Sequence, residues 1–193
     1  MENSTVITGK TRIYGIIGCP ITHSLSPVMQ NAALHAAAVN ATYVPFRVEP
    51  NQLDAAVSGL RALGVCGFNV TIPHKTSIMA LLDGLAPSAV QAGAVNTVVN
   101  QEGQLIGHNT DGDGLVCSLL KDLDCAVAGH GVVLVGAGGA ARGALAALCR
   151  AGVKSVVVLN RTKAAAEELS DSFRLVFPNT LLHGAALDGQ SNC

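Results

Sequence analysis

A glycine-rich turn and the strand before it are the clearest candidates for ligand chemistry in this sequence. Four apolar residues, Val132 to Val135, predict a buried strand, and the helix-prone run Ala140 to Arg150 follows the glycines. The order Gly136-x-Gly138-x-x-Ala141 fits the dinucleotide-binding pattern, in which glycines separate a strand from a helix. Gly136 would allow the tight turn, and Gly138 would let the backbone approach a pyrophosphate at the positive end of the helix. An ordinary glycine-containing turn is the simpler interpretation of this motif alone.

A second predicted strand, Ser155 to Leu159, follows at the distance expected within one nucleotide-binding unit. It ends at Asn160-Arg161-Thr162, where an acidic residue would bind the ribose 2′-hydroxyl of NAD. Because Arg161 is a cation suited to a 2′-phosphate, the sequence favours NADP as the cofactor.

Polar side chains that follow two strands of the first half are candidates for substrate chemistry. The run Asn69 to Lys75 ends a predicted strand, and ligands of open α/β sheets bind beyond the carboxyl ends of strands. A solvated lysine at a helix start is the commoner role, but a cation there opposes the helix dipole. Ser24 and Ser26 lie between another strand and a helix. Helix capping explains Ser26, with Pro27 as the first helical residue, but it does not explain Ser24.

An α/β framework is needed to position these residues. Strands are predicted at residues 12–18, 42–48 and 65–70, with helices at 26–37 and 53–63 between them. Pro45 indicates an edge position for the second strand. A hairpin at 93–108 and a helix at 115–123 follow, and the nucleotide-binding unit spans 131–159. The tail offers two further candidate strands, at 175–177 and 180–187.

The composition excludes several classes of protein. The chain has 193 residues, of which 49% are hydrophobic and 13% charged, and its net charge is −1, so it is not basic enough for nucleic acid. No signal segment or membrane-spanning run is predicted. The six scattered cysteines include no Cys-x-x-Cys pair and are interpreted as reduced core thiols of a cytoplasmic protein. No metal is predicted, because His74 is interpreted as a loop residue and the stretch 109–114 lacks the spaced ligands of a calcium loop.

Six motifs of the sequence together resemble the signature of the shikimate dehydrogenase family. The resemblance runs from about Arg12 to about Glu168, with the motifs in the same order and at the same intervals. Any one of them alone would be weak, whereas six in register are highly specific. They are Ser24-Leu25-Ser26-Pro27, Asn69-Val70-Thr71-Ile72-Pro73-His74-Lys75, Gly93-Ala94-Val95-Asn96-Thr97, Asn109-Thr110-Asp111-Gly112, Gly136-Ala137-Gly138-Gly139-Ala140 and Asn160-Arg161-Thr162.

The resemblance implies a two-domain α/β enzyme with its active site in the cleft between the domains. Residues 1–111 would form the substrate-binding catalytic domain, and residues 112–193 an incomplete Rossmann-type NADP-binding domain. The implied reaction is the reversible, NADPH-dependent reduction of 3-dehydroshikimate to shikimate, in chorismate and aromatic amino acid biosynthesis. The implied partner is this small-molecule substrate, with neither nucleic acid nor membrane, and a homodimer is compatible with the resemblance.

The resemblance also implies a role for each matched side chain. Ser24 and Ser26 would hold the substrate carboxylate, and Thr71, Asn96 and Asp111 would bind ring hydroxyls. Lys75 and Asp111 would form the proton-transfer pair. A lysine ammonium suits this role because it can stabilise the negative charge on a reduced ketone oxygen and supply the proton. The implied cofactor-binding residues are Gly136, Ala137, Gly138, Gly139, Ala140, Asn160, Arg161, Thr162 and Lys163.

Two features depart from the family pattern. The family commonly has a second basic residue three positions after Asn-Arg-Thr, where this sequence has Ala165, with Lys163 as a nearby substitute. A weaker preference for NADP is therefore expected. The chain also stops early relative to the family, by roughly 80 residues if one βαβ unit and the final helices are missing. We therefore expect little activity from this short chain and lower stability in its second half.

Two other functions are alternatives at this point. A quinate or mixed quinate/shikimate dehydrogenase would use the same motifs, and the pair of Ser24 and Ser26 favours shikimate only modestly. A truncated chain that binds ligand with little activity would fit the short C-terminus, although Lys75 and Asp111 are both retained.

Overall fold

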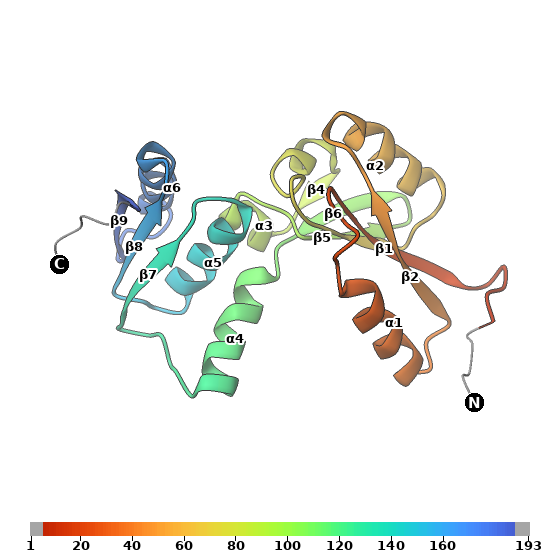
Figure 1. Cartoon of the computed structure of the whole chain (residues 1–193), viewed down its shortest axis with the longest axis horizontal. Coiled ribbons are helices and arrows are strands. Elements are labelled where there is room, and N and C mark those ends of the chain that lie inside the picture. Colours follow the sequence, from red (N-terminus) through yellow and green to blue (C-terminus); the bar gives the residue numbers. More distant parts are fainter. Residues whose placement is uncertain (1–5, 188–193) are drawn as a thin grey trace. The chain divides into compact units, whose positions relative to one another are not determined.

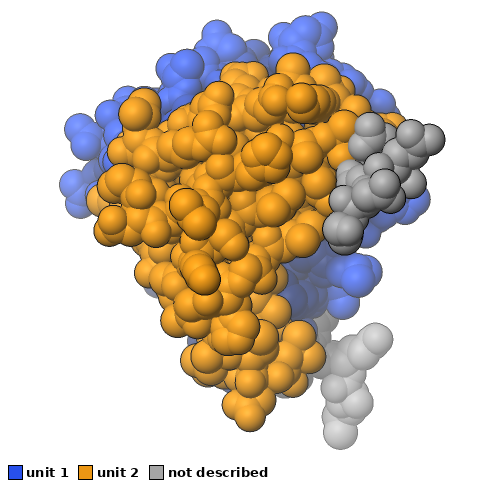
Figure 2. Space-filling model, turned by 90° about the vertical axis from the view of Figure 1, so that its left-hand side faces the viewer, with its two compact units in different colours: residues 1–86, 95–108 blue, residues 87–94, 109–193 orange. Residues whose placement is uncertain are grey.

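The computed structural model describes residues 6–187, which fold into two compact units (Figures 1 and 2). Unit 1 comprises Met1–Ala86 and Val95–His108, and unit 2 comprises Pro87–Ala94 and Asn109–Cys193. The division between residues 111 and 112 concerns the functional domains and stays a prediction.

Unit 1 is built on a six-stranded mixed sheet with the order β2-β1-β3-β5-β6-β4. β1 pairs in parallel with β2 and β3, whereas β5 pairs antiparallel with both β3 and β6. The edge position that Pro45 predicted for its strand is confirmed. The strands are β1 (Arg12–Gly18), β2 (Ala41–Arg47), β3 (Gly67–Val70), β4 (Gly84–Leu85), β5 (Thr97–Gln101) and β6 (Gln104–His108).

Two α-helices, α1 (Ser26–Ala36) and α2 (Leu53–Ala62), lie on opposite sides of this sheet (Figure 1). Leu34 of α1 packs against buried residues of β1 and β2. α2 buries apolar side chains at positions four and three residues apart, the spacing of one helix face. Gly64 follows the end of α2 with a φ of +66°, as the sequence predicted for the helix stop. Two short 3₁₀ helices, η1 (Pro50–Gln52) and η2 (Ser77–Leu81), complete the unit.

Unit 2 contains a three-stranded parallel sheet with the order β7-β8-β9. Its core includes Leu145, Val156, Leu169 and Phe173, which are at most 3% exposed. The predicted sequence of strand, glycine turn, helix and parallel strand is confirmed by β7, α5 and β8. The elements are α3 (Pro87–Ala92), α4 (Asp111–Leu123), β7 (Gly131–Val135), α5 (Gly139–Arg150), β8 (Ser155–Asn160), α6 (Lys163–Arg174) and β9 (Leu181–Ala186).

Two expectations for unit 2 are wrong. Residues 175–177 do not form a strand. Leu175 is the C-cap residue directly after α6 and is 90% exposed, while Phe177 stacks on Phe173 at 6.0 Å between ring centroids. Nor is the first strand of the unit buried on both faces. Val133 and Val135 are 62% and 63% exposed, since the described helices cover only the opposite face of β7.

The cysteines are free thiols where the structure describes them, but most are not core residues. Cys149 is buried, Cys19 and Cys66 are half-buried, and Cys117 and Cys125 are exposed. The interpretation as core thiols is therefore wrong for the last two, which belong to the solvent side of α4 and the turn after it. Cys193 lies outside the described residues. Across residues 6–187, no helix has the length and apolar content needed to cross a membrane.

Ser170 in α6 yields a prediction about stability. Its side chain is fully buried, and its Oγ has no hydrogen-bond partner among the described residues. A buried hydroxyl without a partner costs about 1–3 kcal/mol. We expect Ser170→Ala to raise the free energy of unfolding by about 1 kcal/mol more than Ser172→Ala does, measured by urea denaturation. Ser172 lies on the same helix and donates to the Leu169 carbonyl, so the comparison cancels the helix propensity of alanine. Equal effects of the two substitutions would contradict the prediction.

Candidate active-site residues

Two loops of unit 1 are joined at the carboxyl ends of β1 and β3. The backbone N–H of Cys19 donates to the Ile72 carbonyl at 2.9 Å, and that of Thr71 donates to the Ile17 carbonyl at 3.0 Å. Because β1 and β3 are parallel, both loops leave the sheet at the same edge. The loop that carries Ser24 is therefore tied to the segment that carries Thr71.

The segment before β5 joins the same edge. The Val95 N–H donates to the Lys75 carbonyl at 2.7 Å, and the Val70 N–H donates to the Asn96 carbonyl at 2.8 Å. Asn96 is 9% exposed, and Lys75 is half-buried. Five of the predicted site residues are thus carried by neighbouring segments of unit 1, namely Ser24, Ser26, Thr71, Lys75 and Asn96.

Lys75 lies in a turn rather than at the start of an α-helix. The element after it is η2, a 3₁₀ helix of 5 residues, so the argument from an opposing helix dipole does not apply. The preceding residue, His74, is 1% exposed, and its Nε2–H donates to the Val48 carbonyl at 2.8 Å. His74 therefore anchors the turn that presents Lys75. The sequence could not indicate this contact, because Val48 lies 26 residues away, directly after β2.

The two serines at the start of α1 differ from the sequence-based assignment. The residue before the helix is Leu25, and Ser26 is already its first residue, so the prediction of Ser26 as N-cap and Pro27 as first helical residue is wrong. Instead, the Ser24 hydroxyl accepts the Ser26 N–H at 3.3 Å. Both side chains are half-buried. Ser24, for which capping offered no explanation, is the residue that accepts an N–H at the helix entrance.

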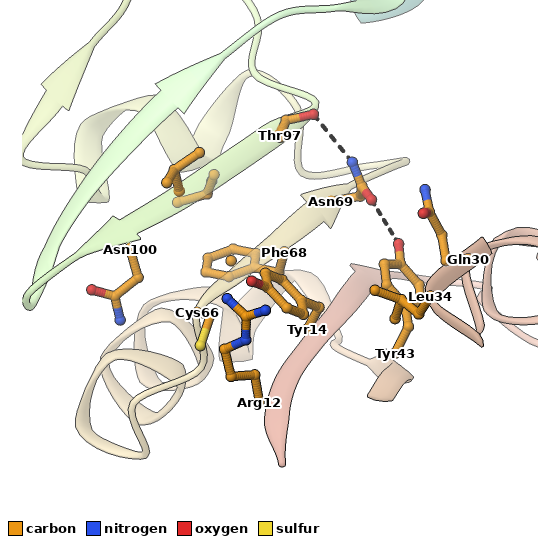
Figure 3. Close-up of a pocket in the computed structure, with 13 residues that line it drawn as sticks. Arg12, Tyr14, Gln30, Leu34, Tyr43, Cys66, Phe68, Asn69, Thr97 and Asn100 are labelled. Carbon is orange, nitrogen blue, oxygen red and sulfur yellow. Dashed lines mark hydrogen bonds between the residues drawn. The ribbon is translucent and has the colours of Figure 1, made fainter. Parts of the chain in front are cut away.

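A cavity of about 600 Å³ opens on one face of the unit 1 sheet (Figure 3). Arg12, Tyr14, Tyr43 and Asn69 are among the residues that line it, and none of the predicted site residues does. Burial raises the pKa of Tyr43 to about 12, so its phenol stays protonated at neutral pH. This hydroxyl therefore acts as a hydrogen-bond donor, and it donates to Asn69.

Asp111 lies in unit 2, where it is the first residue of α4. Its backbone N–H donates at 3.2 Å to Oδ1 of Asn109, whose Nδ2 donates to the Ala94 carbonyl at 3.0 Å. Asn109 is 4% exposed, so this anchor is buried. Lys75 and Asp111 belong to different units, and their action as a proton-transfer pair stays a prediction.

The glycine turn of unit 2 combines a constrained glycine with an open one. Gly136 has a φ of +110°, which side chains rarely adopt, and its N–H donates to the Leu159 carbonyl at 2.7 Å. An ideal Cβ on Gly138 would meet no atom of the protein within 4 Å. Packing therefore does not require glycine at 138, whereas close approach of a ligand to the backbone would. Helix α5 begins directly after Gly138. The backbone N–H groups in the first turn of a helix are the groups that bind phosphate in many proteins.

The end of β8 presents one exposed cation and one paired cation. Arg161 is exposed. Lys163 begins α6 and lies 3.2 Å from Glu167, one turn further along the helix. The Asn160 side chain donates to the Thr162 carbonyl at 3.0 Å and so holds the turn between β8 and α6. Within residues 6–187, no three His, Cys, Asp or Glu side chains come together as a metal site.

Two family models match the chain, each over one part of it. Residues 16–98 match the shikimate dehydrogenase substrate binding domain, and residues 119–183 match shikimate / quinate 5-dehydrogenase. The shikimate dehydrogenase (NADP(+)) of Geobacter metallireducens is 54% identical over 182 residues, which is 94% of this chain and 64% of that protein. The chain thus spans less than two thirds of this relative.

Solved structures of two enzymes resemble the fold. A shikimate dehydrogenase in complex with NADP+ superposes with a TM-score of 0.87 at 38% identity, over 95% of this chain and 64% of the other. A ligand-free 5-ketofructose reductase of Gluconobacter superposes with a TM-score of 0.85 at 35% identity, over 94% and 65%. The fold therefore occurs in enzymes that act on different ketones.

Proposed function

The chain belongs to the shikimate dehydrogenase family, and we propose that it catalyses the reversible reduction of 3-dehydroshikimate to shikimate with NADPH. The reaction would serve the synthesis of chorismate and aromatic amino acids. The joining of the Ser24, Thr71, Lys75 and Asn96 segments at one sheet edge carries the proposal. A ring that bears a carboxylate and several hydroxyls needs such hydroxyl, amide and ammonium partners, because each of its polar groups loses water on binding.

A titration with shikimate tests this assignment on the 193-residue chain. In an isotopically labelled sample, added shikimate should shift the nuclear magnetic resonance signals of Ser24, Ser26, Thr71 and Asn96. The signals of β9 in unit 2 serve as the internal control and should stay in place. Signal shifts at other residues but at none of these four, or no shifts at all, would contradict the proposed substrate site.

Each matched side chain has a role in the proposal. Ser24 and Ser26 hold the substrate carboxylate with their hydroxyls. Thr71, Asn96 and Asp111 bind ring hydroxyls, and Lys75 handles the proton at the reacting oxygen. When bound, NADPH supplies the hydride that reaches the ketone carbon. The Lys75 ammonium then stabilises the oxygen that gains negative charge and donates a proton to it, and in the reverse direction the amine accepts that proton. Asp111 keeps the lysine charged and in place.

The glycine turn fits the NADP cofactor. The open space over Gly138 leaves room for a pyrophosphate at the start of α5, and Gly136, Ala137, Gly139 and Ala140 complete the turn. At the end of β8, Asn160, Arg161, Thr162 and Lys163 would face the adenosine ribose and its 2′-phosphate. Because Lys163 already pairs with Glu167, we assign the larger share of phosphate binding to Arg161.

This assignment predicts a selective loss of NADP+ binding. Arg161→Ala should weaken NADP+ by about 10- to 100-fold, the equivalent of one hydrogen bond to a charged group, and leave NAD+ nearly unchanged. Calorimetric titration of both nucleotides measures the two affinities. Lys163→Ala is the matched control, and its effect on NADP+ should be smaller. Equal weakening of NADP+ and NAD+ by Arg161→Ala would show that Arg161 does not contact the 2′-phosphate.

A mixed quinate/shikimate specificity is the second candidate. One matching family model is described as shikimate / quinate 5-dehydrogenase, and a carboxylate clamp of two serines suits both acids. Comparison of kcat/KM for the two acids decides between them. A third candidate is a chain that binds ligand with little activity. A measurement of turnover distinguishes it from the first two.

The proposed partners are small molecules, and the proposed location is the cytoplasm. A net charge of −1 gives no support for nucleic acid or an anionic membrane surface as a partner. A homodimer belongs to the proposal as well, and sedimentation at several protein concentrations tests it.

A further inference from the structure

A chain of three side-chain hydrogen bonds runs through unit 1 and ends on Asn96. The Tyr43 hydroxyl donates to Asn69 Oδ1 at 2.7 Å, and Asn69 Nδ2 donates to Thr97 Oγ1 at 3.1 Å. The Thr97 hydroxyl then donates to Asn96 Oδ1 at 3.0 Å. Figure 3 shows the first two bonds, which connect side chains from β2, β3 and β5 across the sheet.

The direction of this chain is fixed at Asn69, because the Asn96 carbonyl can only accept a hydrogen bond. The amide nitrogen of Asn69 donates to that carbonyl at 3.2 Å and to Thr97 Oγ1 on the same side. The amide oxygen of Asn69 therefore faces Tyr43 and accepts the phenol proton. The Thr97 oxygen accepts from Asn69, and its single proton goes to Asn96 Oδ1. The oxygen of the Asn96 amide consequently faces Thr97, and its NH₂ group points the other way.

The start of this chain is held by α1. Asn31 accepts the Tyr43 N–H at 2.9 Å and donates to the carbonyls of Tyr43 at 2.9 Å and Pro27 at 2.8 Å. The same helix begins at Ser26. Tyr43 is 6% exposed, so water does not readily replace Asn69 as the hydrogen-bond partner of its hydroxyl. One continuous network thus reaches from α1, the helix that begins at Ser26, to the amide of Asn96.

We propose that Tyr43, Asn69 and Thr97 are positioning residues that orient the Asn96 amide so that its NH₂ group donates to a substrate hydroxyl oxygen. The orientation of the Asn96 amide follows from the contacts within unit 1, whereas the identity of the substrate that carries the hydroxyl rests on the proposed function. If the amide were flipped by 180°, it would present its oxygen to the substrate instead, and the substrate hydroxyl would have to donate the hydrogen bond. The network therefore selects which partner of this hydrogen bond supplies the proton.

The first experiment uses the ligand-free chain and tests the orientation alone. Heteronuclear relaxation of the Asn96 side-chain NH₂ group should show a rigid amide in the wild type and in Thr97→Ser, which keeps the hydroxyl. The amide should become mobile in Thr97→Val, which has the same shape without the hydroxyl, and partly so in Tyr43→Phe. An Asn96 amide that is equally rigid in Thr97→Val would overturn the proposal.

The second experiment tests the role in binding through a double-mutant cycle. Thr97→Val should weaken shikimate binding by about 5- to 10-fold, the effect of one ordinary hydrogen bond. In an Asn96→Ala background the same substitution should have no further effect, because the group that it orients is gone. An equal loss in both backgrounds would mean that Thr97 acts only on the fold. A wild-type chain that does not bind shikimate would overturn the proposed substrate, while the relaxation experiment would still decide the orientation.

Discussion

Replacement of Lys75 by alanine is expected to lower kcat by ~10²–10⁴-fold while changing the substrate affinity much less. The loss has this size because a positioned proton donor acts on the transition state, where charge develops on the carbonyl oxygen. The lysine side chain is half-buried on a turn that His74 anchors and that Val95 joins to the Asn96 segment. A group held in this way loses little entropy when it meets the reacting oxygen.

The measurement is a steady-state assay in a hybrid protein. In it, this sequence replaces the aligned region of the Geobacter metallireducens relative, which is 54% identical. Lys154→Ala is the matched control, because Lys154 is exposed and directly precedes β8, at the end of that strand opposite to Asn160 and Arg161. It should leave kcat unchanged. A Lys75→Ala hybrid with undiminished kcat would remove Lys75 from the proton-transfer step.

The second large effect is expected at Gly112, where α4 and α5 approach each other closely. An ideal Cβ on Gly112 would lie 2.2 Å from the Gly143 carbonyl oxygen and 2.5 Å from Ala147 Cβ. Neither neighbour is a flexible side-chain end, so the two helices would have to separate. Gly112→Ala should therefore lower the free energy of unfolding by about 2–3 kcal/mol, at the upper end of overpacking costs. Urea denaturation of unit 2, followed by the amide signals of α5, measures the change.

Gly114 offers a control on the same helix. An ideal Cβ there meets no atom within 4 Å, so Gly114→Ala should stabilise the protein by about 0.5–1 kcal/mol through helix propensity. The opposite signs of the two substitutions separate packing from propensity. A stabilising Gly112→Ala would contradict the close contact between α4 and α5. Gly112→Ala should also disturb the Asn109 anchor of Asp111, because the new methyl group would displace the Gly143 backbone. Gly143 in turn lies against Asn109, since an ideal Cβ on Gly143 would be 2.8 Å from Asn109 Oδ1.

The sequence predicted most strands and several helices because their patterns are local. The glycine turn, the run of β-branched residues in β8 and the helix stop at Gly64 each depend on a few consecutive residues. α6 was not predicted, although Ala166, Leu169 and Phe173 recur at helical spacing and are buried. The strand expected at 175–177 rested on three apolar residues, and the ring stacking of Phe177 on Phe173 holds this segment against α6 instead.

The contacts that organise unit 1 could not be predicted, because they join residues far apart in the chain. Tyr43 and Asn69 are 26 residues apart, and they meet only because β1, which lies between β2 and β3, sets the register of both strands. The same holds for the contact of His74 with Val48. Residue types could therefore indicate which side chains suit a polyhydroxylated acid. The direction of the amide at Asn96 follows only from the register of the sheet.

Turnover by the hybrid protein tests most directly whether these residues catalyse the oxidation of shikimate by NADP+. NADPH formation is followed by absorbance with shikimate and NADP+ as substrates, and circular dichroism first establishes that the hybrid is folded. We predict shikimate-dependent NADPH formation that depends on Lys75 and is slower with NAD+. A folded hybrid that forms no NADPH above the level of its Lys75→Ala variant would contradict the proposed function.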